Sequence, residues 1–261
     1  MLSFLKKYFK PNHKVSDFSS IGFNFEVFED IYKLGKLASD RGERINIPMR
    51  GYYDKLSTES GAELWAQISK DHQGIGLHPA FNGECTIKVK ARPFLESSRL
   101  SVLDGYYDCW LITSEQDYPL LFESPNFYQT ALDGSDIIAE AQVTAFAKEV
   151  KIFTDEDERK KDKIWGFWAP QSFVPSGTFS TKENYESFEQ QPVAIFSGYI
   201  KKVLLKRNEI TGNKFYHLIV ESLSASYDVV ADPALLLSEP QVGNILSGQF
   251  YLSGKIVNNI S

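Results

Sequence analysis

Hydrophobic side chains between residues 23 and 39 recur at the spacing of one helix face. Val27, Ile31, Leu34 and Ala38 follow one another at intervals of four, three and four residues, which is the period of an amphipathic helix. Acidic residues come early in this segment and basic residues late, the order that the helix dipole favours. The pattern predicts one helix, inside an N-terminal segment that covers residues 1–42.

From Arg44 onward the chain changes to short alternating or β-branched runs separated by Gly, Pro, Asn and Ser. Such a rhythm is typical of a β-rich region. The clearest predicted strands cover residues 86–91, 106–113, 118–123 and 137–153, while residues 62–69 fit a helix or a strand equally well. We therefore expect an acidic β-rich domain over residues 43–133.

The C-terminal part of the chain carries the most regular strand pattern. Strands are predicted at residues 192–207 and 214–223 around a turn, and then at residues 227–231, 244–246 and 249–257. Asp232 and Pro233 predict a short helical turn after the third strand, because proline is favoured at the first helical position. This order is that of an OB-like, partly open barrel. The predicted fold class is α+β and predominantly antiparallel β, with an OB-like β-barrel domain over residues 134–261.

Two polar segments interrupt this last domain. Residues 154–163 are almost entirely charged and predict a solvated hairpin loop. Residues 176–192 are rich in Ser, Thr, Glu and Gln and predict a second exposed loop. Residues 138–154 resemble residues 195–211 as long strand-like runs that enter a polar turn, with residues 165–168 and 215–218 as the returning strands. Whether the two β regions are related by duplication stays open.

Composition supports a sheet protein. The chain has 261 residues, of which 19 are Phe, 13 are Tyr, 4 are Trp and only 2 are Met. Flat, stiff aromatic side chains favour sheets over helical bundles. A chain of this length buries roughly 70–75% of the surface of its unfolded state, so a core forms without a disulfide or a structural metal.

Negative charge is concentrated in the middle of the chain. The formal charge is −6 overall, whereas residues 51–150 hold 7 basic and 15 acidic residues, a balance of −8. A net acidic protein is a poor general coat for nucleic acids, because their phosphates need a cationic face. The acidic section instead suits a basic protein as partner.

The N-terminus and the cysteines indicate a cytoplasmic protein. Residues 1–10 lack the continuous apolar segment of a signal peptide, and no run of about 18 apolar residues predicts a transmembrane helix. Leu2, Leu5 and Phe9 share one face of a basic segment, which makes peripheral membrane contact through residues 1–10 a minor alternative. Cys85 and Cys109 lie among apolar residues and are expected to be reduced core residues.

One loop is dense in histidine and is a candidate metal or acid–base site. Asp71, His72 and His78 fall within eight residues, and imidazole with carboxylate is a common combination in such sites. However, the interval from His72 to His78 fits no common ligand motif. Walker A, Gly-x-Ser-x-Gly and His-Glu-x-x-His motifs are missing as well. We therefore assign no catalytic residue, no metal ligand and no cofactor.

A basic hairpin near the C-terminus is the second candidate site. On an OB-like barrel this hairpin borders the ligand face, where nucleic-acid bases stack on aromatic side chains and phosphates meet cations. Single-stranded nucleic acid is therefore an alternative partner. The candidate ligand-binding residues are Tyr199, Lys201, Lys202, Arg207, Lys214 and Tyr216.

Asp228 and Asp232 are spaced so that they could form an acid–base pair. Capping of the turn at Pro233 explains Asp232, and we expect Asp228 to be exposed.

Without catalytic motifs, the chain is best interpreted as a non-catalytic binding or interaction protein that neutralises or assembles with a basic protein through its acidic surface. The alternatives are a single-stranded nucleic-acid-binding protein and an enzyme that uses the His72/His78 loop.

Overall fold

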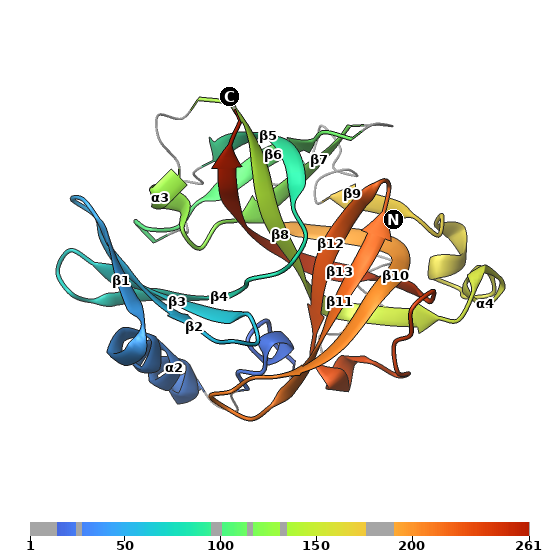
Figure 1. The fold of residues 1–261 in the computed structure, drawn as a ribbon, viewed down its shortest axis with the longest axis horizontal. Coiled ribbons are helices and arrows are strands. Elements are labelled where there is room, and N and C mark those ends of the chain that lie inside the picture. The colour runs from blue at the N-terminus through green and yellow to red at the C-terminus, as the bar shows by residue number, and fades with distance from the viewer. Residues whose placement is uncertain are drawn as a thin grey trace, which may run out of the picture.

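The computed structural model of the chain describes residues 15–24, 28–94, 101–113, 117–130, 135–175 and 191–260. Strands dominate these residues and form one four-stranded and one nine-stranded sheet. Figure 1 shows the smaller sheet with its helix on one side of the molecule and the larger sheet on the other. The predicted β-rich α+β fold is confirmed in this coarse form.

The smaller sheet is an antiparallel meander with one helix on its outer face. Its strands β1 (Glu43–Ile47), β2 (Gly51–Ser57), β3 (Ala62–Ser69) and β4 (Gly74–Phe81) pair in chain order. Residues 62–69, which fitted two structures by sequence, thus form β3. Helix α2 (Phe28–Arg41) directs Leu34, Leu37 and Ala38 into the same apolar cluster as Leu64 of β3.

The predicted helix at residues 23–39 is confirmed with shifted ends. Helix α2 continues to Arg41 because the Gly42 amide still donates to the Ala38 carbonyl at 2.7 Å. Phe23 does not belong to the helix. It follows a 3-10 turn, η1 (Ser19–Ile21), and is fully buried in the apolar cluster beneath the sheet.

The larger sheet contains two partly ring-like circuits of strand pairing that share two long strands. Along the described residues, the first circuit is β8–β5–β6–β7–β13 and the second is β8–β12–β11–β10–β13, with β8 and β13 paired to each other. The pairs β7–β13 and β12–β8 are parallel. The strands are β5 (Ile87–Phe94), β6 (Tyr106–Leu111), β7 (Tyr118–Glu123), β8 (Ile137–Phe153), β9 (Ser172–Pro175), β10 (Val193–Arg207), β11 (Lys214–Ser222), β12 (Ala225–Ala231) and β13 (Ile245–Asn259).

Both circuits are built in the same order along the chain. The first takes β5, β6, β7, helix α3 (Phe127–Thr130) and β8, and the second takes β10, β11, β12, the 3-10 turn η4 (Pro233–Leu235) and β13. The position of β8 in the first circuit therefore corresponds to that of β13 in the second. The similarity between residues 138–154 and residues 195–211 instead predicts that β8 corresponds to β10. Residues 165–168 contain a 3-10 turn, η2 (Trp165–Phe167), and not a returning strand. Hydrogen bonds also cross the boundary expected between residues 133 and 134, because β5 pairs with β8.

Aromatic side chains fill the core of the larger sheet, as the composition predicts. The Phe196 ring stacks on Phe250 with centroids 4.0 Å apart and lies 5.5 Å from Tyr227. The buried hydroxyl groups of Tyr118 and Tyr227 are 2.8 Å apart and satisfy one another. The shared strand β8 borders both circuits, and it contributes small side chains to this core: Ala139, Ala141, Ala145 and Ala147.

The expectation of a wholly solvated loop at residues 154–163 is wrong. Helix α4 (Glu156–Lys160) forms there, and the Asp155 side chain caps it by accepting from the Glu158 amide at 2.8 Å. Arg159 is buried, and its guanidinium donates hydrogen bonds to the carbonyl groups of Trp165 and Trp168. A guanidinium carries five donors, and buried turn carbonyls provide acceptors for them.

Some predictions fall outside the described residues. These are the amphipathic segment at residues 1–10 and nearly all of the polar loop at residues 176–192. Among the helices that the structure describes, none has the length and apolar character needed to cross a membrane.

Candidate functional site

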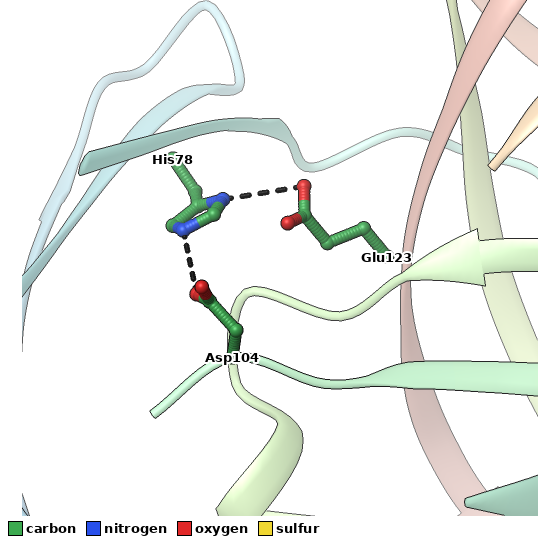
Figure 2. A group of neighbouring side chains, drawn as sticks. All are labelled: His78, Asp104 and Glu123. Atoms are coloured by element: carbon green, nitrogen blue, oxygen red, sulfur yellow. Dashed lines mark ion pairs between the residues drawn. The ribbon is translucent and has the colours of Figure 1, made fainter. Parts of the chain in front are cut away.

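His78 bridges the two sheets by contacting two carboxylates. The side chain comes from β4, while Asp104 precedes β6 and Glu123 ends β7 (Figure 2). The ring Nε2 lies 2.9 Å from Asp104 Oδ1, and Nδ1 lies 3.2 Å from Glu123 Oε2. Because both ring nitrogens face carboxylate oxygens, the imidazole is held as a doubly protonated cation.

Neighbouring polar groups complete the hydrogen bonds of the two carboxylates. Asp104 accepts from Gln67 Nε2 at 2.6 Å and from the Ser101 amide at 2.7 Å. The Tyr251 hydroxyl donates to Glu123. Gln67 lies on β3 and Tyr251 on β13, so the network again connects the two sheets.

The charges of this cluster shift the pKa values of its members. Burial lowers the pKa of His78, but the carboxylates of Glu123 and Asp104 outweigh it and hold that pKa well above its usual range. Burial alone would raise the pKa of Asp104. The hydrogen bond and charge of His78 have the larger effect and hold that pKa below its usual value. The cluster is thus stable as a cation between two anions.

The residue types of this cluster could bind a metal, but their arrangement favours an ion-paired clamp. His78, Asp104 and Glu123 offer ligand atoms within 4.8 Å of one another, and His with carboxylates is a known zinc ligand set. However, the two carboxylates face different nitrogens of one ring. Each carboxylate thus pairs with its own ring nitrogen, and the imidazole is the cation between them.

The structure separates the other two members of the predicted histidine loop from His78. Asp71 and His72 lie on the exposed turn between β3 and β4, where His72 has a left-handed φ of 59°. The Tyr52 hydroxyl lies 3.5 Å from Nδ1 of the His72 ring. The sequence pattern indicates His78 but not Asp104 and Glu123, which the fold brings from 26 and 45 residues further along the chain.

The basic hairpin is formed by β10 and β11, and three of its candidate side chains already have partners within the chain. The Tyr199 hydroxyl donates to Glu156 at 2.6 Å. Lys201, which lies at a register shift of β10 between Ile200 and Lys202, contacts Glu221 at 3.1 Å. Lys202 contacts Glu84 at 2.6 Å. The remaining candidates are Arg207 and Lys214, exposed opposite each other at the hairpin end, and Tyr216, packed against the core.

Asp228 is fully buried, so the expectation that it is exposed is wrong. Its carboxylate contacts His217 Nε2 at 2.7 Å and accepts from the Glu84 and Cys85 amides at 3.0 and 2.8 Å. Asp232 caps its turn as predicted, accepting from the Ala234 amide.

The Cys85 and Cys109 thiols are free, and burial raises the pKa of Cys85 to about 12, which makes it a poor nucleophile.

Part of the negative charge in residues 51–150 is neutralised within the fold. Glu63 is a buried example, because it is 2% exposed and lies 3.0 Å from both Lys55 and Lys255. The excess of acidic residues in the sequence is therefore larger than the excess on the surface. Among the described residues of this section, the carboxylates with cationic partners include Asp54, Glu63, Glu84, Asp104, Glu123 and Asp136.

An apolar cavity of about 340 Å³ lies between α2 and the strands β3 and β4. Ile31 of α2 and Ala66 and Leu77 of the sheet line it, and Gly35 leaves open space above them. The exposed side chains of Tyr32 and Ile75 stand at its rim. Leu77 and His78 are neighbours on β4, so alternation places the cavity and the His78 cluster on opposite faces of the smaller sheet.

Comparisons with known proteins identify no relative: no protein-family model matches the chain, and neither do any of the curated proteins or solved structures compared with it.

Proposed function

We propose that this chain is a non-catalytic binding protein whose partner is another polypeptide. The observation that carries the proposal is the apolar cavity between α2 and β4. Its volume of about 340 Å³ falls in the range of ligand pockets in proteins. The lining of aliphatic side chains, with few polar groups, suits apolar side chains of a partner better than a charged metabolite.

The position of β4 indicates how such a partner binds. This strand is at one edge of the smaller sheet and pairs with β3 alone in that sheet. Its first residues, Gly74 and Ile75, are exposed beside the cavity. An exposed edge strand can add an extended peptide by main-chain hydrogen bonds, while an adjoining pocket selects alternate side chains. We therefore propose an extended segment with apolar residues at alternate positions.

The larger sheet serves this function as a rigid support. The order of pairing in each circuit, with a short helix before the fourth strand, supports the proposal of OB-like units that share β8 and β13. The smaller sheet is fixed to this support through His78 and Glu63. A cytoplasmic location is proposed on the sequence evidence alone.

A library of random twelve-residue peptides displayed on phage, selected on the immobilised chain, tests the proposal. A selected peptide is then synthesised, labelled and measured by fluorescence anisotropy. Gly35→Met should weaken binding at least tenfold, because a Cβ at Gly35 meets nothing within 4 Å and the longer side chain fills the cavity. Ile75→Asp should weaken it similarly by placing a charge at the edge strand.

Ile210→Asp is the matched control, because Ile75 and Ile210 are both 36% exposed and Ile210 lies in the β10–β11 turn. This variant should bind the peptide as tightly as the unchanged chain. Selection of no peptide, or equal affinity for the Gly35→Met variant, would overturn the proposal.

The other partners expected from the sequence have less support. A basic protein would meet an acidic section in which several carboxylates are ion-paired already. Single-stranded nucleic acid would meet a hairpin whose Lys201 and Lys202 are neutralised by Glu221 and Glu84. An enzyme that uses the His72/His78 loop would need the two imidazoles to act together. In the structure His72 lies beside Tyr52, whereas His78 lies between Asp104 and Glu123.

A further inference from the structure

The outer face of β5 and β6 gathers charged groups around an exposed indole ring. Ala91 and Cys109 of these strands are buried in the core of the larger sheet, while the alternate residues point outward. In the register of the two strands, Lys90 lies opposite Trp110 and Arg92 lies opposite Asp108. Trp110 is 53% exposed.

These side chains surround a shallow polar pocket. Its volume of about 120 Å³ leaves room for part of one ring-sized ligand. The residues that line it are Lys90, Ala91, Arg92, Asp108, Trp110 and Asp136.

The charged groups of the pocket balance one another. Asp136 lies 2.6 Å from Arg92 Nε and 3.1 Å from Lys90 Nζ. Asp108 brings a second carboxylate beside the two cations, so the lining carries equal numbers of positive and negative groups. Such a pocket presents donors and acceptors together, without the net positive charge that a phosphate requires.

We propose that this pocket binds a neutral sugar ring. A pyranose has an apolar face of C–H groups that packs on an indole ring, and it has hydroxyl groups that both donate and accept hydrogen bonds. Trp110 provides the flat apolar surface. Asp108 and Asp136 accept from the hydroxyls, and Arg92 and Lys90 donate to them. The site is independent of the polypeptide cavity, which lies on the smaller sheet.

A printed array of neutral, sulfated and sialylated glycans, probed with the fluorescently labelled chain, tests this assignment. The unchanged chain should bind a subset of the neutral glycans. Trp110→Ala should reduce that signal at least tenfold, because it removes the stacking surface. Phe167→Ala is the control, since Phe167 is 91% exposed and does not line the pocket. It should leave the signal unchanged.

Three outcomes overturn the proposal: no neutral glycan is bound, neutral glycans are bound equally by the Trp110→Ala variant, or only the anionic glycans are bound. A fluorescently labelled single-stranded oligonucleotide, measured by anisotropy at low and moderate salt, provides a further arm. Salt-sensitive binding of the oligonucleotide that depends on Trp110 would assign the pocket to nucleic acid and overturn the sugar assignment.

Discussion

Replacing His78 with alanine should destabilise the protein strongly, because this side chain joins the two sheets. The variant leaves Asp104 and Glu123, with side chains 12% and 10% exposed, without the cation between them. Breaking a buried ion pair by removing one partner costs about 3–5 kcal/mol. The low end, about 3 kcal/mol, applies because the His78 side chain is still 18% exposed.

Urea unfolding at pH 6, followed by tryptophan fluorescence, measures this loss. With a denaturant slope of about 3 kcal/mol per molar for a chain of this size, the midpoint should fall by about 1 M. Adding Asp104→Asn and Glu123→Gln to His78→Ala should restore part of the stability, because the neutral amides no longer repel each other. A loss below about 1 kcal/mol, with no recovery in the triple variant, would refute the role of His78 as a clamp.

The pH dependence of the same loss has a defined sign. The folded-state pKa of His78 is raised above 6.5, so its contribution is complete below pH 6.5 and is lost as the pH rises through the raised pKa. The folded-state pKa of Asp104 is lowered below 3.8, so its contribution is complete above pH 3.8 and is lost as the pH falls through the lowered pKa. The difference between wild type and His78→Ala should therefore be largest between about pH 4 and pH 6.5. A difference that grows in alkali would contradict the argument.

Three further substitutions or reactions test the core. Asp228→Ala should cost about 3 kcal/mol in urea unfolding, because it leaves two amides and His217 without their buried acceptor; a cost under about 1 kcal/mol would contradict this role. Phe196→Ala should cost about 3–5 kcal/mol in the same assay, because Phe196 is fully buried between other rings. Cys85, with its pKa raised to about 12, should react with iodoacetamide at pH 8 at least tenfold more slowly in the folded chain than in urea, as measured by peptide mass spectrometry.

The local elements were predictable from the sequence because their signals are local. Apolar residues at helical spacing gave α2, and alternation gave β5, β6 and β7 to within a few residues. The sharing of β8 and β13 between two circuits was not predictable, since it depends on pairing between strands about a hundred residues apart. Periodicity identifies a strand and its faces but not its partner.

The candidate site shows the same limit in chemical form. His78 was singled out together with Asp71 and His72, which are close to it in sequence, but its partners are Asp104 and Glu123. One usable signal was present: alternation on β4 places His78 on the face away from Leu77 and α2. A polar residue on that inward-facing side of a sheet requires a partner from the element packed against it.

The charge balance of residues 51–150 does not measure the charge of the surface, for a related physical reason. A count of charges indicates an acidic surface only if the carboxylates remain in solvent, but the face of the smaller sheet that meets the larger one carries Glu63 and His78, each ion-paired across the interface. Burial of these pairs requires well-aligned partners to offset the loss of hydration. The opposite side of the smaller sheet, with α2 and the edge strand β4, is the side on which we propose that a partner binds.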